Sequence, residues 1–347
     1  MVERHPEMVK ERHLKTLDGL WVVWGSGLLL LVVILLAPTV GSQPLNWREV
    51  WEYLHGQSTR SGIIFFQLRL PRVLLAALAG GGLAVAGVVF QALLRNPLAT
   101  PYTLGISAGS ALGAVLAIKW HLSGLWLGFS PVQWCALGGG LATLLLVMAL
   151  ARSAAGWSIH TLVLAGVTMN YFLGALILFA QYLADFTETI QMVRWMMGQI
   201  STTGTPLLMA TAGLVISVSV ILWILAKPLD LISTSPELAL SRGVSVQQVQ
   251  WIALSLAALV TAGLVALCGP IGFVGLVVPH VLRMLAGPAH RVLIMAALFT
   301  GAAFLLLADT LARTLIPPVD LPVGILTALV GGPFFLWLLF RREQVFL

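Results

Sequence analysis

The sequence predicts an all-α protein that crosses a membrane about ten times. Only 9% of its 347 residues are charged and 59% are hydrophobic, whereas a soluble domain carries about 25% charged residues. The mean hydropathy is +0.97. Long uncharged runs recur along the chain, and the run from Val73 to Leu94 can cross a bilayer core of about 30 Å as a helix. Helices are expected throughout because lipid offers the backbone no hydrogen-bond partner.

Ten segments are expected to span the membrane within a single domain from residue 20 to residue 342. They lie at 20–38, 71–94, 101–118, 131–151, 159–181, 206–226, 248–268, 272–286, 292–312 and 321–340. Three of them begin with a hydroxyl residue followed by proline, at Thr100-Pro101, Ser130-Pro131 and Thr205-Pro206. A hydroxyl at the N-cap and proline at the first helical position is a common way to begin a helix.

Residues 1–19 are expected to form a cytoplasmic tail. The tail mixes acidic and basic residues, and the apolar run after it is too long for a signal peptide and lacks a cleavage site. An even number of spans places both termini on one side, which the positive-inside rule makes cytoplasmic. The basic residues on this side are Arg95, Arg152, Lys227, Arg242, Arg291, Arg341 and Arg342. Arg69 and Arg72 lie close to the membrane on the outer side and therefore need another explanation.

What the sequence lacks argues against several classes of function. The net charge of +6 is spread over single basic residues without stacking aromatics, so nucleic acid is not an expected partner. There is no P-loop and no H-E-x-x-H motif. Cys135 and Cys268 lie in apolar runs, with no disulfide or metal-binding spacing. A proton- or sodium-coupled carrier usually needs an acidic residue within the membrane. No acidic residue falls near the middle of an expected helix here. The chain is therefore expected to be no enzyme, to bind no cofactor or metal, and to take any energy for pumping from another chain.

A polar segment, LDLISTSPELALSRGVSVQQVQ from Leu229 to Gln250, is expected to lie outside the membrane. Ser235 is placed to cap a short helix that Gly243 ends, and Ser245 to Gln248 fit a capping box for the next helix. Two short helices are thus expected to meet at a glycine. Ala239 and Gly243 then present small residues to a partner, unless the segment is an ordinary loop.

Asp309 and Arg313 are four residues apart near a membrane end, where such a pair is favourable on a helix. One interpretation is an interfacial ion pair. The other is that Arg313 joins Arg69 and Arg72 in a positive ring on the outer face, which docks the carboxylates of another protein.

Polar residues inside the expected helices form a further group of candidates. Asn170, with Thr168 and Gly166 beside it, lies within one span, and Gln91 and Ser107 lie within two others. Such residues face the protein interior or a cavity. Both helix packing and a translocation path remain open for them.

Several short motifs occur in an order typical of one family. They are Arg69-Leu70-Pro71-Arg72, Arg95-Asn96-Pro97-Leu98-Ala99, Leu104-Gly105 with Ser107 and Gly109, Trp195 with Gly198, the run GPIGFVGL from Gly269 to Leu276, Pro279-His280 with Arg283, Ala308-Asp309 with Arg313, and Leu321-Pro322-Val323-Gly324. With these motifs, from about residue 25 to 342, the chain resembles the FecCD family. Its members are permease subunits of binding-protein-dependent ABC importers for iron–siderophore complexes, haem and vitamin B12.

The resemblance implies a homodimer like the vitamin B12 importer, with ten helices per subunit and one central path. Two ATP-binding-cassette ATPases would bind on the cytoplasmic side and carry the ATP and Mg²⁺, and a substrate-binding protein would dock outside. Coupling helices would lie at about 235–247, with the residues Ser235, Glu237, Ala239, Arg242, Gly243 and Val244. Arg69, Arg72 and Arg313 match docking positions. Family motif positions are Arg95, Asn96, Pro97, Gly272, Pro279, His280 and Asp309.

The expected function is import of an iron complex, a siderophore or haem, across a bacterial or archaeal cytoplasmic (inner) membrane. The alternatives are the same architecture importing vitamin B12 or molybdate, a stand-alone channel or secondary carrier, and a polytopic membrane enzyme. Three positions depart from the family pattern: Thr100 replaces an acidic residue, Arg242 a leucine, and Asp320 a glutamate.

Overall fold

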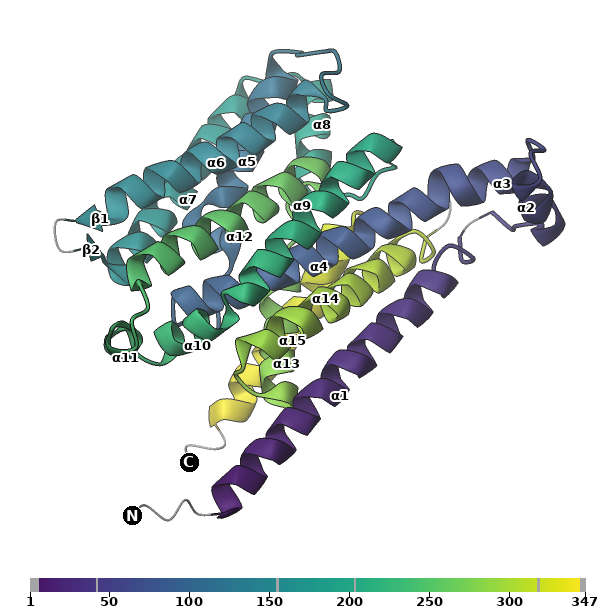
Figure 1. The fold of residues 1–347 in the computed structure, drawn as a ribbon. Coiled ribbons are helices and arrows are strands. Elements are labelled where there is room, and N and C mark those ends of the chain that lie inside the picture. Colours follow the sequence, from purple (N-terminus) through teal and green to yellow (C-terminus); the bar gives the residue numbers. More distant parts are fainter. Residues whose placement is uncertain (1–5, 42, 154–155, 203, 317–318, 344–347) are drawn as a thin grey trace.

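In the part of the chain that the structure describes, ten apolar helices form the bundle, and each overlaps one of the expected spans. Figure 1 shows how they are arranged. The computed structural model describes residues 6–41, 43–153, 156–202, 204–316 and 319–343. The ten helices are α1 (Pro6–Leu36), α4 (Leu70–Leu93), α5 (Ile106–Lys119), α6 (Pro131–Ala151), α7 (Ile159–Tyr182), α9 (Thr205–Ile224), α12 (Val246–Cys268), α13 (Val274–Ala286), α14 (His290–Ala312) and α15 (Val323–Glu343). Seven helical segments are long and apolar enough to cross a membrane, and three shorter apolar ones, in α5, α13 and α15, complete the set.

Short elements connect the spans at the two ends of the bundle. They are α2 (Trp47–Leu54), α3 (Arg60–Ile63), the π-helix η1 (Ile64–Arg69), the 3-10 helix η2 (Pro101–Leu104), α8 (Phe186–Met196), α10 (Ala226–Thr234) and α11 (Pro236–Ser241), with the two-residue strands β1 (Arg152–Ser153) and β2 (Gly156–Trp157). Figure 1 shows α2, α3 and α8 at one end of the bundle, called the outer end below, and α10, α11, β1 and β2 at the other, the inner end.

Helix α4 lies at the centre of the bundle and packs most extensively against α14. Glycines allow the close approach. A Cβ at Gly80 would lie 2.1 Å from the carbonyl oxygen of Gly301 on α14, and a Cβ at Gly87 would lie 2.0 Å from that of Gly275 on α13. Between membrane helices, such small residues let backbones touch and gain packing contacts. The glycine-rich stretch of α4 therefore sets the position of both neighbours.

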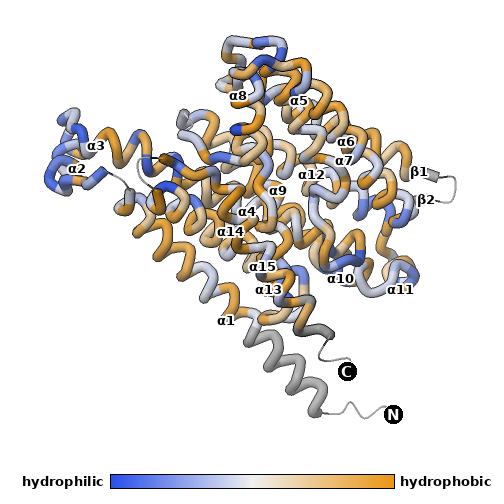
Figure 2. Tube along the Cα trace, turned by 180° about the vertical axis from the view of Figure 1, so that it is seen from behind, coloured by the Kyte–Doolittle hydropathy of each residue, from blue (hydrophilic) through white to orange (hydrophobic). Residues whose placement is uncertain are grey.

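Residues along the helices of the bundle are mostly hydrophobic, whereas hydrophilic residues gather at its ends (Figure 2). On α1, the side chains of Trp21, Leu28 and Leu35 are exposed, although they are large and hydrophobic. An apolar flank with polar ends fits a bilayer as the solvent.

Several expected helix boundaries were wrong. The span at 101–118 begins as η2 and breaks at Gly105, whose φ of +80° ends η2 before α5 starts at Ile106. Helix α9 is capped by Gly204, and Thr205 is already its first residue. Ser130 is correctly placed, since it forms a capping box with Gln133. Helix α1 begins at Pro6, so most of the expected tail is helical, and residues 1–5 lie outside the described residues.

Candidate functional site

The outer end holds a cluster of three arginines and two aspartates drawn from distant parts of the chain. Arg72 on α4 places Nη2 3.0 Å and Nε 3.2 Å from Oδ1 of Asp309 on α14. Its Nη1 lies 2.7 Å from Oδ2 of Asp320. The expected pair on α14 is also present, with Arg313 Nε 3.6 Å from Asp309 Oδ2. Asp309 is fully buried, so two guanidinium groups neutralise a charge that lipid or protein could not otherwise accommodate.

Arg69 and Arg313 also hold the chain that leaves α1. Arg69 donates to the carbonyl oxygens of Pro38 and Thr39 at 3.0 and 3.3 Å, and to that of Gln43. Arg313 donates to the carbonyl oxygen of Ala37 at 2.9 Å. Both arginines are only 7% exposed. Their charge therefore fixes the loop after α1 to the ends of α4 and α14.

The expected ring thus exists as a cluster, but its members are already bonded within the chain. Arg69, Arg72 and Arg313 line a cavity of about 380 Å³ together with Asp320. The Asp320 side chain is 40% exposed, against 15% for Arg72. Docking of an acidic partner at these arginines remains a prediction, and it requires a partner that reaches into the cavity or displaces Asp320.

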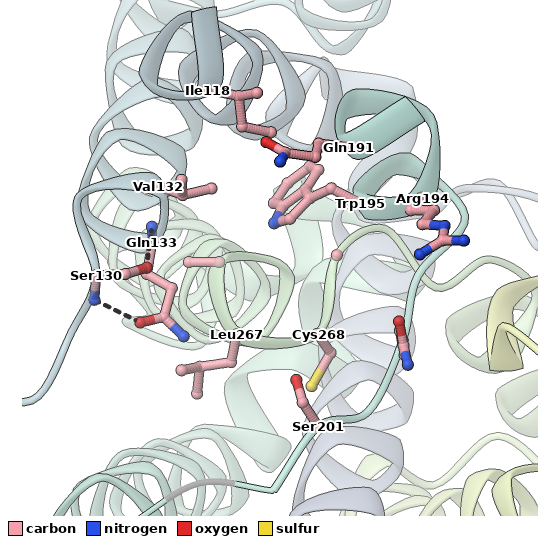
Figure 3. A pocket seen from close by; sticks show the side chains of 13 residues that line it. Ile118, Ser130, Val132, Gln133, Gln191, Arg194, Trp195, Ser201, Leu267 and Cys268 are labelled. Atoms are coloured by element: carbon pink, nitrogen blue, oxygen red, sulfur yellow. Dashed lines mark hydrogen bonds between the residues drawn. The ribbon is translucent and has the colours of Figure 1, made fainter. Parts of the chain in front are cut away.

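A second cavity at the outer end, of about 390 Å³, was not expected from the sequence (Figure 3). Its polar wall combines Ser130, Gln133, Gln191, Arg194, Gln199 and Ser201, and the Trp195 indole also lines it. The capping box of α6 turns Gln133 back to the backbone of Ser130, at 2.8 Å. Of its lining residues, the sequence analysis noted Ser130, Trp195, Cys268 and Gly269, each for another reason, because single residues near helix ends carry no signal of a shared cavity.

Three glycines allow the backbone that forms the wall of this cavity to lie directly against the start of α15. A Cβ at Gly198 would lie 2.4 Å from the carbonyl oxygen of Pro270, and one at Gly269 would lie 2.4 Å from that of Trp195. At Gly324 it would lie 2.3 Å from the carbonyl oxygen of Met197. Gly198 and Gly269 have φ of +71° and +69°, which favours glycine. The ends of α8 and α12 and the start of α15 therefore meet without side chains between them.

The residues considered for a translocation path lie in two places. Asn170 on α7 donates to the carbonyl oxygen of Tyr102 at 2.8 Å, and a Cβ at Gly166 would lie 2.4 Å from that of Thr103. Ser107 is buried, whereas Thr168 is exposed. These four lie around α7 and its neighbours η2 and α5. Gln91 is separate, since its amide nitrogen lies 3.4 Å from the Leu276 carbonyl oxygen on α13.

Gly166 and Asn170 therefore have clear packing roles in the single chain. Gln91 is also almost fully buried, at 1% exposure. A path that uses these residues remains a prediction, and it depends on the exposed face of α7.

The segment expected to couple to a partner lies at the inner end as α10, α11 and the start of α12. Ser235 caps α11 and accepts from the Leu238 amide at 3.2 Å. Val244 N–H donates to the Ala239 carbonyl and Gly243 N–H to the Leu240 carbonyl, which together form a Schellman motif with Gly243 at φ +77°. Gly243 ends α11 as expected.

Three details of this segment differ from expectation. Ala239 is fully buried, so it supports α11 from below and presents nothing to a partner. Exposed Leu238 and Leu240 face solvent in its place. The element that follows Gly243 is the long α12, and the second short helix is α10, before α11. The Ser245 hydroxyl lies 2.9 Å from Oε1 of Gln248 and caps no backbone amide.

Two charged residues of this segment are exposed, Glu237 and Arg242. The Ser235 hydroxyl donates to the Glu237 carboxylate, and this hydrogen bond is the main reason that the pKa of Glu237 lies below its ordinary value. Glu237 therefore carries a negative charge at neutral pH, next to the two leucines. Val244 is half-buried behind them.

The remaining motif residues shape turns and packing. Arg95 has φ +48° and donates to the Ile232 carbonyl at 3.3 Å, and Asn96 Oδ1 accepts from the Leu98 amide at 2.9 Å, just after Pro97. His280 packs against the Phe335 ring at 5.8 Å.

On α13 and before it, the motif makes a bend. Pro279 lies inside α13, and the Gly272 carbonyl accepts from the Val274 amide. Among the described residues no group of three His, Cys, Asp or Glu could hold a metal ion.

Comparison with known proteins gives one consistent family. A model described as the FecCD transport family matches residues 29–341. The hemin transport system permease protein of Yersinia pestis is 38% identical over 325 residues, which is 92% of this chain and 96% of that protein.

Other relatives are named for different transported substrates. The cobalamin import system permease protein of Halobacterium salinarum is 34% identical over 93% of this chain and 97% of its own length. The molybdate import system permease protein of Haemophilus influenzae is 33% identical over 93% and 96%. A solved structure described as an inward-facing ABC transporter superposes with a TM-score of 0.80 at 32% identity, over 93% of this chain and 99% of that one.

Proposed function

The chain belongs to the FecCD transport family and is an integral membrane permease of the ABC importer type, and from this we propose that its cargo is an iron complex, a siderophore or haem. The observation that carries the proposal is the hemin permease relative, which matches 92% of the chain. Permeases of this kind are not enzymes themselves. The energy for transport would come from the hydrolysis of ATP, bound with Mg²⁺, on separate ATPase subunits.

The inner end offers a fitting contact for such an ATPase. Helix α11 is short, presents Leu238, Leu240, Glu237 and Arg242, and is fixed to the bundle through buried Ala239 and the Schellman turn at Gly243. An exposed helix that is joined to α10 and α12 at its two ends can pass a displacement of a bound partner on to the helices of the bundle. We place the ATPase contact here, with both termini on the same, cytoplasmic side.

The outer end would receive the binding protein. The cluster of Arg69, Arg72 and Arg313 lies beside the carboxylate of exposed Asp320. A carboxylate of a docking protein would compete with Asp320 for Arg72, which would link docking to the contacts between α4 and α14. Two copies of the chain would enclose the path, with α7 contributing Thr168 and exposed Tyr171.

Reconstitution tests the cargo. The chain is placed in proteoliposomes with its cognate ATPase, and labelled haem, a ferric siderophore, cobalamin and molybdate are each supplied with a matching binding protein. ATP-dependent uptake of an iron complex supports the proposal. Uptake of cobalamin or molybdate alone would replace it with the second candidate, which the names of two relatives favour.

A further inference from the structure

A cavity of about 250 Å³ opens between four helices at the inner end. It lies where α4 and α13 end, beside α10 and the start of α14, and it is separate from the exposed face of α11. The residues that matter here are Gln91, Arg95, Ser233, Arg283 and His290. They were not expected to share a site, because they come from three distant stretches of the chain, around residues 91–95, 233 and 283–290.

The cavity is cationic. Arg95 and Arg283 each donate only a long hydrogen bond to a backbone carbonyl, at 3.3 Å to Ile232 and 3.5 Å to Val88. In the described part of the chain no carboxylate lies within ion-pair distance of either guanidinium. Glu237 interacts with Arg95 through its long-range field, without an ion pair, and the Asp230 carboxylate near the cavity bonds to His290. Two guanidinium groups without a counter-ion favour an anionic occupant.

Two hydrogen-bond acceptors of cavity-lining residues have no partner. Gln91 and His290 are 1% and 3% exposed, and both Oε1 of Gln91 and Nε2 of His290 are buried without a hydrogen bond. His290 Nδ1 lies 2.6 Å from Asp230 Oδ1, so in the neutral imidazole the proton between them belongs to Nδ1 and the lone pair is on Nε2. Buried polar groups without a partner are rare and call for an explanation.

Helix ends alone do not account for these features. Arginines after α4 and in the last turn of α13 are favourable near the negative ends of the helix dipoles. That argument explains the charges, but it explains neither the space beside them nor the two unpaired acceptors. An anionic occupant explains the charges and the space, and a hydroxyl on it would give the two buried acceptors a partner once the Gln91 or His290 side chain turns toward the cavity.

We propose that this cavity binds a phosphate group that carries a hydroxyl donor, supplied by a glycerol phospholipid headgroup of the inner leaflet or by inorganic phosphate. The guanidinium groups of Arg95 and Arg283 hold the phosphate oxygens, and the hydroxyl donates to Gln91 or His290. Basic pockets between membrane helices on the cytoplasmic side are a known way to recognise anionic lipid headgroups. The choice of leaflet rests on the proposed orientation, whereas phosphate recognition does not.

An occupant would matter for the neighbouring elements. Ser233 lies on α10, which leads directly into α11, and Asp230 on the same helix accepts from the backbone amide of His290 at 2.9 Å. A bound phosphate would add a second connection between α10 and the ends of α4 and α13. It would thereby stiffen the support of α11.

Binding is measured by thermal unfolding of the full chain in a neutral detergent, with added phosphatidylglycerol or phosphatidylcholine. Phosphatidylglycerol is expected to stabilise the chain and phosphatidylcholine is not. Arg95→Gln and Arg283→Gln should each weaken the apparent affinity about tenfold, the effect of losing one charge-assisted hydrogen bond. The matched control is Arg291→Gln, since Arg291 lies at the same end but stacks over Trp223.

A second arm identifies the source of the phosphate. Inorganic phosphate is compared with sulfate, which lacks a hydroxyl, at equal ionic strength. Stabilisation by phosphate over sulfate without a lipid effect assigns the site to the free ion, and a lipid effect assigns it to the headgroup; both support the proposal. It is overturned if neither ligand binds selectively, or if Arg291→Gln is as damaging as the two cavity variants.

Ser233→Asp serves as a second variant that should block the cavity without unfolding the chain. The new carboxylate would pair with the cavity arginines, so the chain should stay folded and lose phosphatidylglycerol and phosphate binding. Retained binding in this variant overturns the proposal. None of these measurements depends on transport, so a failed uptake assay leaves their outcome intact.

Discussion

Asp309 is fully buried on α14 and accepts hydrogen bonds from Arg72 of α4, while Arg313 of its own helix stands 3.6 Å away. A buried carboxylate of this kind is tolerated only with its counter-charges in place. Asp320 bonds to the same guanidinium group but is 40% exposed, so water can replace it. The two aspartates therefore carry very different structural weight, although both pair with Arg72.

Asp309→Asn is expected to destabilise the folded chain by about 3–5 kcal/mol, because it leaves the buried Arg313 without a charge partner and Arg72 with Asp320 alone. Asp320→Asn should cost less than about 1 kcal/mol, as exposed pairs do. Thermal unfolding in detergent compares the two. If the two variants lost equal stability, the burial of Asp309 would not explain its contribution to the free energy of unfolding.

A variant of one arginine in the cluster tests whether docking and stability depend on the same side chain. Arg72→Gln is expected to weaken binding of the substrate-binding protein and to lower the unfolding temperature, because the same side chain would serve both. Surface plasmon resonance on the folded fraction, read beside the melting curve, separates the two effects. Normal docking by a folded Arg72→Gln chain would remove Arg72 from the docking surface.

At the scale of elements, contact between helices rests on glycine. Gly80→Ala is expected to cost about 1–3 kcal/mol, since the new Cβ would overlap the Gly301 carbonyl on α14 and force the helices apart. Gly174→Ala on α7 is the matched control, as its Cβ would meet no atom within 4 Å. The unfolding temperatures of the two variants give the comparison. A harmless Gly80→Ala would mean that α4 and α14 pack less tightly than described.

Helix α8 is fastened to α5 by charge. Glu188 accepts from Lys119 at 2.8 Å, and this hydrogen bond is the main reason that its pKa lies below the ordinary value. A lowered carboxylate pKa gives stability that is present at neutral pH and is lost as pH falls below about 4.5 through the folded-state pKa. Glu188→Gln should flatten the fall in unfolding temperature between pH 6 and pH 3. An unchanged acid profile would contradict the role of this pair.

Helix α11 allows a test of coupling that leaves the fold intact. Leu240→Glu changes an exposed side chain and is expected to reduce transport per ATP hydrolysed about tenfold, in line with loss of a central apolar contact. Gln247→Glu in the first turn of α12 is the control. Gly243→Val is a poorer test, because a β-branched residue at φ +77° strains the turn itself. Equal coupling in Leu240→Glu and the control would move the ATPase contact elsewhere.

At the scale of the molecule, the bundle has an apolar flank, polar ends and cavities at both ends. The outer cavities and the inner cavity lie on opposite sides of a core in which α4, α12 and α14 are closely packed. Movement of cargo through one chain alone would have to break this core. A path between two chains along α7 avoids that cost, which is the architecture expected of the homodimer.

The sequence by itself determined the ten helices, the membrane environment and the family. Apolar runs of bilayer length have few alternatives in lipid, and the motifs stand in a fixed order along the chain. It also predicted the Asp309–Arg313 pair and the helix end at Gly243, because both depend on neighbours within one turn. These are local or compositional properties, which a linear pattern contains.

Only the tertiary structure decided which partners those residues take. Arg69, Arg72 and Arg313 look like surface charges in the sequence, yet they are bonded inside the chain. The loop after α1 supplies carbonyl acceptors to Arg69 and Arg313, and Asp309 of α14 pairs with Arg72, more than 200 residues away in the sequence. Ala239 looked exposed beside Gly243 and is buried. The cavity with Arg95, Arg283 and His290 has no linear signal, because packing of distant helix ends creates both its space and its charge.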